Sequence, residues 1–156
     1  MDTRMMRRIL EGGCQCGSVR YRYEGEVLFI FVCHCTECQK QSGSAFGMGL
    51  WIQASGLQRL SGTLRSWTRR LPAGEDMICE FCEECGTRVF HISEGYRAAG
   101  MLSIKPGTLD DTSWIQPYAH IWRTRAQPWM IFKPGTVLYE RSPPSLASLA
   151  SAPAQP

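Results

Sequence analysis

Apolar and polar residues alternate over short stretches of this chain, and glycine or proline separates one stretch from the next. Stretches of about four to eight residues bounded by turn residues are typical of β-strands. The segment Val27–Val32 is apolar throughout, which favours a strand buried on both faces. The other strands that we expect are Ser18–Tyr23, Ala45–Ile52, Leu57–Leu60, Leu64–Thr68, Met77–Cys82, Arg88–Ile92, Ala98–Ile104, Tyr118–Trp122 and Thr136–Tyr139.

The sequence predicts a single short helix. One or two turns are expected over Thr36–Ser42, and Gly43 directly after them is a suitable helix stop. The fold that we predict is therefore an all-β domain over residues 9–140. Residues 1–8 are expected to be a loose N-terminal arm. The Ser-, Ala- and Pro-rich residues 141–156 are expected to be a disordered tail.

Size and composition fit one soluble globular domain, since the chain has 156 residues, of which 44% are hydrophobic and 20% charged. The longest apolar run is far too short to span a bilayer, so no membrane partner is expected. The N-terminal arginines are followed by no apolar run of the kind that marks a secretory signal, which predicts a reducing cytoplasm as the compartment. The formal net charge of +3 is small and scattered, which argues against a nucleic-acid partner.

Eight cysteines fall into three tight clusters. They are Cys14-Gln-Cys16, Cys33-His-Cys35-Thr-Glu-Cys38 and Cys79-Glu-Phe-Cys82-Glu-Glu-Cys85. Spacings of one or two residues, in a reducing compartment, are typical of zinc ligands. A closed structural zinc site takes four thiolates, whereas a catalytic zinc keeps one position open. Clusters of two, three and three cysteines therefore predict one closed site, one open site and one cysteine that belongs to neither.

The predicted closed site joins two halves that are far apart in the chain. Its ligands are Cys14, Cys16, Cys82 and Cys85. The first two cysteines are two residues apart, so an extended strand would place both thiols on one face. The second two form a zinc knuckle with Gly86, because the glycine lets the backbone fold so that its amides point at the sulfurs. Such a site would staple the first strand to a hairpin about seventy residues later.

The predicted open site is the middle cluster, and its ligands are Cys33, Cys35 and Cys38. Three thiolates leave a bound zinc ion with a single net negative charge, which makes the ion a weak Lewis acid. It would acidify a bound water little, but it would still hold an incoming thiol in the deprotonated form. The open position therefore suits a thiol substrate better than a hydrolytic water.

Five residues near the clusters have competing interpretations. Cys79 is an alternative zinc ligand, but its place on a predicted strand favours a small buried core residue. His34 is a candidate fourth ligand of the middle site, which would make that site structural, although adjacent residues rarely reach one metal together. Glu37 is a candidate general base, with an exposed helix position as the alternative. His91 and His120 are expected to be strand residues with hydrogen-bond partners.

The motifs that contain these cysteines resemble one known family. The residues that carry the resemblance are Gly13-Cys14-Gln15-Cys16-Gly17-Ser18-Val19-Arg20-Tyr21, Cys33-His34-Cys35-Thr36-Glu37-Cys38, Ser42-Gly43-Ser44-Ala45-Phe46, Phe81-Cys82-Glu83-Glu84-Cys85-Gly86-Thr87, Gly107-Thr108-Leu109-Asp110-Asp111, Pro117-Tyr118-Ala119-His120-Ile121 and Gln127-Pro128-Trp129. From about Gly12 to about Phe132 the chain thus resembles the glutathione-dependent formaldehyde-activating enzyme family, a group that includes centromere protein V.

The resemblance implies an all-β fold of curled sheets. The fold that we expect is therefore a single zinc-stapled domain of curled antiparallel sheets with one short helix. It implies two Zn²⁺ per chain, with a structural zinc at the four-cysteine site and a catalytic zinc at Cys33, Cys35 and Cys38. The implied activity is of the carbon–sulfur lyase type, namely the reversible addition of glutathione to formaldehyde. Cys79 lies outside the family's ligand pattern.

Two functions of different class follow from these patterns. The first is a zinc-dependent lyase that acts on an adduct of glutathione, or of another thiol, with a small aldehyde such as formaldehyde. Lys40, Arg69 and Arg70 are then candidate clamps for the substrate carboxylates. The alternative is a non-catalytic zinc module that binds a protein or nucleic-acid partner. A recess beside an open metal position favours the enzyme, and a fourth protein ligand or a flat basic surface favours the module.

Overall fold

Strands make up most of the regular structure, which confirms the predicted all-β class. The computed structural model describes residues 7–71 and 74–145. In chain order the elements of this part are β1 (Arg7–Gly13), β2 (Arg20–Cys33), α1 (Thr36–Ser42), β3 (Gly47–Gln53), β4 (Leu57–Ser61), β5 (Leu64–Arg70), β6 (Asp76–Cys82), β7 (Arg88–Ser93), α2 (Glu94–Ala98), β8 (Met101–Ile104), β9 (Ala119–Ile121) and β10 (Val137–Leu138). Short 3-10 turns lie at Ala54–Gly56, Pro106–Thr108 and Arg123–Arg125.

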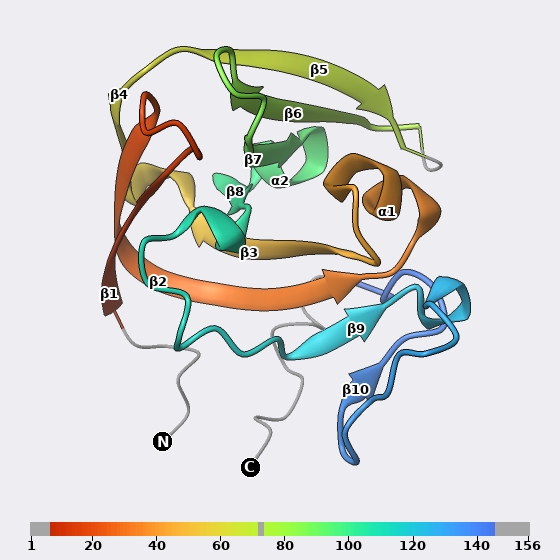
Figure 1. Ribbon diagram of the computed structural model, residues 1–156. Coiled ribbons are helices and arrows are strands. Elements are labelled where there is room, and N and C mark those ends of the chain that lie inside the picture. Colours follow the sequence, from red (N-terminus) through yellow and green to blue (C-terminus); the bar gives the residue numbers. More distant parts are fainter. Residues whose placement is uncertain (1–6, 72–73, 146–156) are drawn as a thin grey trace.

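The longest strand, β2, runs through both halves of the sheet (Figure 1). Its first half pairs with β1 and β4, and its second half pairs with β3 and β9. We expected two strands here, separated at residues 24–26, and this expectation is wrong. The ladder with β1 continues through the gap, where Gly25 pairs with Arg8. Gly25 serves packing instead of a turn, because a Cβ there would lie 2.4 Å from the Tyr23 hydroxyl oxygen.

The other strands extend the sheet in the order β10-β9-β2-β3-β8-β7-β6-β5. The sheet curls, so that the β5–β6 hairpin lies across from β2 (Figure 1). Most neighbours are antiparallel, as we expected. The antiparallel expectation is wrong for β9, which runs parallel to both β2 and β10. Parallel neighbours cannot be joined by a tight turn, and β9 follows β2 only after six other strands.

Two apolar clusters form the core, and β2 and β3 contribute to both. Successive residues of a strand point to opposite faces, so Ile30 belongs to one cluster and Phe29 to the other. In the first cluster the rings of Tyr21 and Phe90 meet edge to face, with their centroids 5.1 Å apart. The apolar run Val27–Val32 therefore packs against apolar residues on both faces, as its composition predicts.

The helix predicted over Thr36–Ser42 is confirmed as α1, and Gly43 ends it with a left-handed backbone at φ 62°. The structure adds a second helix, α2, where the sequence predicted one helix in all. The five residues of α2 are too few for helical periodicity to show, although the Ser93 side chain caps the helix by accepting from Tyr96 N. Strand β8 consequently begins at Met101, later than predicted.

The structure describes part of each predicted terminal segment. Arg7 and Arg8 lie in β1, so the predicted loose arm of residues 1–8 is too long by two residues, while residues 1–6 lie outside the described residues. Of the predicted tail of residues 141–156, residues 146–156 lie outside the described part as well. Trp122 contacts the beginning of the tail, because its backbone and indole N–H groups donate to Arg141 O and Ser142 Oγ. In the described ranges we find no helix with the length and apolarity needed to cross a membrane.

Candidate metal centres

Four cysteines from two distant parts of the chain meet at one point: Cys14, Cys16, Cys82 and Cys85. The first two lie between β1 and β2, the third ends β6, and the fourth lies in the turn before β7. Their sulfur atoms all lie within 4.8 Å of one another. The Cys14–Cys16 and Cys16–Cys82 sulfur distances are 3.4 Å and 3.9 Å. Sulfurs around a tetrahedral zinc would lie about 3.8 Å apart, given a Zn–S bond of about 2.3 Å, so this donor set fits the ion.

Both halves of this four-cysteine cluster are tight turns closed by a glycine. Gly17 N donates to Cys14 O at 3.1 Å, and Gly86 N donates to Cys82 O at 2.9 Å. The two glycines have φ values of 82° and 74°, in the left-handed region that glycine favours. The extended strand expected for the first pair is therefore wrong, since this half is a turn like the second. The turn also directs Val19 N to the Cys14 sulfur at 3.2 Å.

Two hydroxyl side chains beside this cluster were missed by the sequence reasoning. Ser18 Oγ lies 3.2 Å from the Cys16 sulfur and 3.3 Å from the Cys82 sulfur. Thr87 Oγ1 lies 3.2 Å from the Cys85 sulfur, and its hydrogen bonds lower the pKa of Cys85 to about 5. Hydrogen bonds of this kind hold metal-binding thiols in the deprotonated form. Each hydroxyl stands two residues after a cysteine, which is the signal that identifies it.

Three further cysteines meet where β2 ends and α1 begins. Cys33, Cys35 and Cys38 have their sulfur atoms within 4.8 Å of one another. Cys33 is the last residue of β2, while Cys35 caps α1, its sulfur accepting from Cys38 N at 3.4 Å. Hydrogen bonds from Cys33 and Cys38 lower the pKa of Cys35 far below the ordinary thiol value. The same interaction raises the pKa of Cys33, so Cys35 is the thiol of this cluster that ionises most readily.

One side of the three-cysteine cluster is free of further protein donors. Among the described residues, no fourth Cys, His, Asp or Glu joins the group. Gly47 on β3 lies against it, because a Cβ at this position would be 3.0 Å from the Cys38 Cβ and 3.4 Å from its sulfur. Cys35 and Cys38 are partly exposed, whereas Cys33 is buried. Three donors without a fourth resemble a catalytic metal site more than a closed structural one.

His34 turns away from the sulfurs on either side of it. It is fully buried, and its Nε2 lies 2.9 Å from Nδ1 of His120 on β9. The two imidazole rings stack with their centroids 5.2 Å apart, and Phe132 packs edge-on against both. The structure therefore places His34 in a pair with His120, away from the three sulfurs.

The other residues singled out from the sequence lie as follows. Cys79 is buried on β6 and belongs to neither cysteine group. Glu37 is 60% exposed on α1, with its Oε2 3.8 Å from Nη1 of Arg69. His91 is buried on β7, where its Nε2 accepts from Arg88 Nη1 at 3.5 Å. Burial, followed by the nearby cations, lowers the pKa of His91 far below its usual range, so this ring is neutral.

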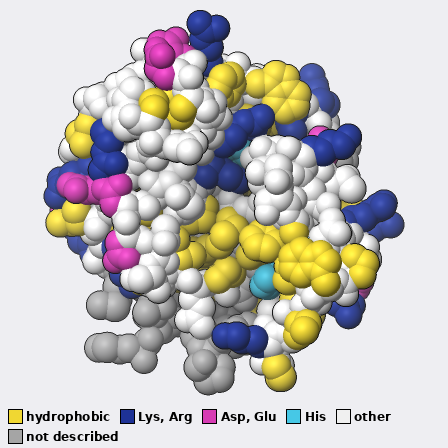
Figure 2. All heavy atoms as spheres, in the orientation of Figure 1, with side chains coloured by type: hydrophobic (Ala, Val, Ile, Leu, Met, Phe, Trp, Pro, Cys, Tyr) yellow, Lys and Arg dark blue, Asp and Glu magenta, His cyan; other side chains and the backbone are white. Residues whose placement is uncertain are grey.

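The three basic residues proposed as substrate clamps differ in burial and in their partners. Arg69 is largely buried on β5 and acts electrostatically on Cys35. Lys40 is exposed, and Arg70 is 70% exposed and pairs with Asp76 at 3.0 Å. Lys105, directly after β8, acts on Cys38 and was missed, because nothing in a lone lysine after a strand signals its surroundings. Figure 2 shows Lys and Arg side chains in a recess near the centre of the face, above a band of hydrophobic side chains.

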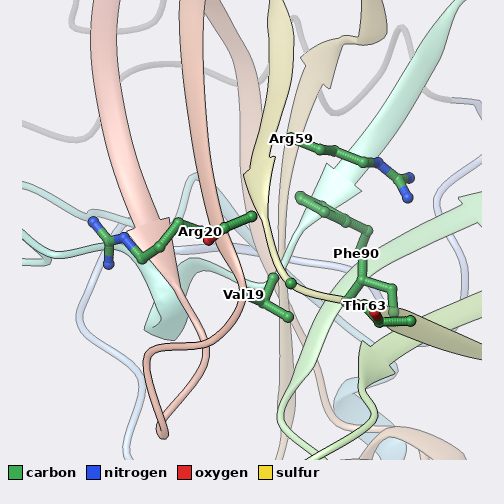
Figure 3. Close-up of a pocket in the computed structure, with 8 residues that line it drawn as sticks. Val19, Arg20, Arg59, Thr63 and Phe90 are labelled. Carbon is green, nitrogen blue, oxygen red and sulfur yellow. The ribbon is translucent and has the colours of Figure 1, made fainter.

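Two surface cavities lie apart from the three-cysteine cluster. One, of about 220 Å³, is lined by Val19, Arg20, Arg59, Thr63 and Phe90 among others. Figure 3 shows Arg20 and Arg59 pointing in opposite directions there. Each is bound through two nitrogens to a carboxylate, Arg20 to Asp110 and Arg59 to Glu80. These arginines are thus satisfied within the protein, and this cavity offers no free cation to an anionic ligand.

Comparison with known proteins identifies one family. A family model described as glutathione-dependent formaldehyde-activating enzyme matches residues 9–125, which covers more than half of the chain and all seven cysteines of the two clusters. A comparison with curated proteins gave no match.

Proposed function

We propose that this chain is a zinc-dependent carbon–sulfur lyase-type enzyme. It belongs to the glutathione-dependent formaldehyde-activating enzyme family. Its substrate would be the adduct of glutathione, or of a related thiol, with formaldehyde. The observation that carries this proposal is the presence of two unlike sulfur clusters in one domain. One has four donors, and the other has three. The first suits a structural ion and the second suits an ion that exchanges a ligand.

The reaction forms or breaks one carbon–sulfur bond. In the forward direction the sulfur of a thiolate adds to the carbonyl carbon of formaldehyde, and the carbonyl oxygen takes up a proton to become a hydroxyl. A zinc ion held by Cys33, Cys35 and Cys38 would supply an incoming thiol in its deprotonated form. The protein itself would hold both reactants in one place, and this proximity can supply much of the rate enhancement.

The residues beside the three-cysteine cluster support this role. Gly47 lets β3 pack directly against Cys38, because a Cβ at this position would lie 3.0 Å from the Cys38 Cβ. Arg69 and Lys105 act electrostatically on Cys35 and Cys38 and offset their negative charge. The alternative of a non-catalytic module is less well supported. A fourth protein ligand would favour it, and none joins this cluster among residues 7–71 and 74–145.

We expect the purified protein to bind two zinc ions per chain, with unequal lability. The four-cysteine cluster has a donor for each position of a tetrahedral ion, whereas the three-cysteine cluster leaves one position for a competing chelator. Metal analysis after stepwise treatment with a mild chelator should therefore pass through a form with one zinc. Simultaneous loss of both ions, or a protein that never holds more than one, would contradict the division into two kinds of site.

The one-zinc form also tests the proposed activity. Exchange NMR at equilibrium measures how fast formaldehyde moves between its hydrate and its adduct with glutathione. The two-zinc protein should accelerate this exchange, the one-zinc protein should not, and added zinc should restore it. The matched control is the same protein carried through chelation with zinc present. Equal acceleration by the one-zinc and two-zinc forms would show that the three-cysteine cluster is not the reaction site.

A further inference from the structure

The backbone of His34 is anchored to two other elements of the fold. His34 stands between Cys33 and Cys35 in the chain and is fully buried. Its N–H donates to Ile121 O at 3.0 Å, directly after the last pair of the ladder between β2 and β9 (Figure 1). Its carbonyl oxygen accepts from Gln39 Nε2 on α1 at 2.8 Å. The residue between two of the proposed zinc ligands is therefore held from both sides.

Gln39 is itself held by the segment that follows β9. Its Nε2 also donates to Arg125 O at 3.0 Å, and its Oε1 accepts from Gln127 Nε2 at 2.9 Å. Because both polar atoms of this amide are used, the side chain has one favoured orientation. The segment after β9 thus fixes the position of the His34 carbonyl group through Gln39.

The ring of His34 is enclosed and has one hydrogen-bond partner. Its Nε2 lies 2.9 Å from Nδ1 of His120, whereas its buried Nδ1 has no partner among the described residues. A neutral imidazole carries one N–H, and an N–H at this Nδ1 would be left unpaired, so Nε2 is the atom that donates to His120. Phe46 and Phe132 pack edge-on against the His34 ring, with centroids 5.7 Å and 5.6 Å away. These contacts leave the ring little freedom to rotate.

A fixed ring at position 34 determines where the neighbouring sulfurs point. Cys33 ends β2, and Cys35 has an extended backbone with φ −62° and ψ 153°. Successive side chains of an extended segment point to opposite sides, so the His34 ring takes one side and the two sulfurs share the other. If the ring left its pocket, the segment would turn and carry both sulfurs away from the sulfur of Cys38.

We propose that His120 and Gln39 are positioning residues of the three-cysteine cluster. They hold the ring and the carbonyl group of His34, and they thereby fix the directions of the Cys33 and Cys35 sulfurs. The inference rests on the proposed function, which places a zinc ion at these sulfurs, and adds two residues that are not ligands themselves. Groups behind metal ligands typically change metal affinity by about 10- to 100-fold.

Two substitutions of His120 separate its hydrogen bond from its packing. His120→Phe keeps an aromatic ring against His34 and Phe132 but removes the acceptor. His120→Asn loses the ring but can place its Oδ1 where Nδ1 accepts. Competition with a chelator measures the zinc affinity of the three-cysteine cluster. We expect this affinity to fall about 10-fold or more in His120→Phe, and to stay within about 3-fold of the wild type in His120→Asn.

Cobalt(II) provides a second measurement, which reports the geometry of the sulfurs instead of their affinity. It is added to the protein form with one zinc, so that it fills the three-cysteine cluster. Its visible absorption bands depend on the number and arrangement of the sulfur donors. The bands should shift in His120→Phe and match the wild type in His120→Asn. A residue that only stabilised the fold would leave the bands of the folded protein unchanged.

Gln39→Met tests the second anchor and does not depend on whether His120→Phe folds. Gln39 is half-buried on α1, and methionine suits a helix, but it cannot donate to the His34 and Arg125 carbonyl groups. Zinc affinity should fall here as well, and the cobalt bands should shift.

Tyr21→Phe is the matched control for the loss of one buried hydrogen bond. It keeps the ring and removes the bond between the Tyr21 hydroxyl group and Thr108 Oγ1 at 2.7 Å, in the other core cluster. The melting temperature should fall, while the three-cysteine cluster should bind zinc as in the wild type.

Each outcome decides the proposal. Weaker zinc binding and shifted cobalt bands in His120→Phe and Gln39→Met, with wild-type behaviour in His120→Asn and Tyr21→Phe, support it. Wild-type zinc affinity and bands in His120→Phe and Gln39→Met overturn it and leave the proposed function standing. Equal losses in His120→Phe and His120→Asn, or an equal loss in Tyr21→Phe, would assign the effect to ring packing or to general stability, and overturn it too. If the wild type holds no zinc at this cluster, the positioning role and the proposed function fail together.

Discussion

Cys82→Ser is expected to abolish stable folding at physiological temperature. Cys82 is fully buried at the end of β6, and its sulfur lies 3.9 Å from that of Cys16, which is 66 positions earlier in the chain. A structural zinc ion contributes on the order of 10 kcal/mol to small zinc domains. Domains of this size are stable by about 5–15 kcal/mol in all. Loss of one ligand therefore removes a contribution comparable to the whole stability, and thermal melting with metal analysis measures it.

Cys79→Ser is the matched control for this substitution. Cys79 is as deeply buried and lies on the same strand, but its sulfur belongs to neither cluster. Placing a hydroxyl there should cost about 1–3 kcal/mol, the ordinary effect of a polar atom in a core position. The structural role of the four-cysteine cluster would be refuted by a Cys82→Ser protein whose melting curve matches that of Cys79→Ser.

Cys35→Ser should have the opposite effect. The protein should remain folded, but the three-cysteine cluster should no longer hold zinc. The three-cysteine cluster spans only residues 33–38, so little loop closure depends on it. Serine is also among the best helix N-caps, and it can replace the Cys35 sulfur that accepts from Cys38 N at 3.4 Å. We expect bound zinc to fall from two ions to one. Glutathione binding should weaken more than about 100-fold, since loss of a ligand exceeds the effect of losing a residue behind it.

Calorimetric titration of glutathione into wild type, Cys35→Ser and Cys79→Ser measures this effect. Cys79→Ser carries the same chemical change outside both clusters, and its glutathione binding should equal that of the wild type. Glutathione binding of equal strength in Cys35→Ser and the wild type would reject the thiol-substrate proposal and favour a non-catalytic zinc module.

The cysteine groups could be predicted because local spacing determines most of their geometry. Cys35 and Cys38 are one helical turn apart, and Cys82 and Cys85 lie in one knuckle with Gly86. Within each half, the local backbone geometry largely determines where the sulfur atoms point. The pairing of the two distant halves came from counting ligands, and the structure brings those four sulfurs together.

What could not be predicted depends on the order of strands in the sheet. Arg69 and Lys105 are far apart in the chain, and both act electrostatically on the three-cysteine cluster because β5, β6, β7 and β8 are consecutive in the sheet. For a related reason, the sequence did not predict β2 as one continuous strand. Gly25 resembles a turn residue in the sequence, but the partner strand β1 carries the ladder across it. Long-range pairing overrides local signals in both cases.

The distance along the chain between the two halves of the four-cysteine cluster has a consequence for synthesis. During translation Cys14 and Cys16 are made long before Cys82 and Cys85. During that interval the nascent chain presents two adjacent thiols without their partners, open to oxidation and able to hold a metal ion only weakly. Metal capture by the four-cysteine cluster must therefore wait until Cys85 has been made, a little past the middle of the 156-residue chain. The yield of active protein then depends on the supply of zinc and reductant during translation.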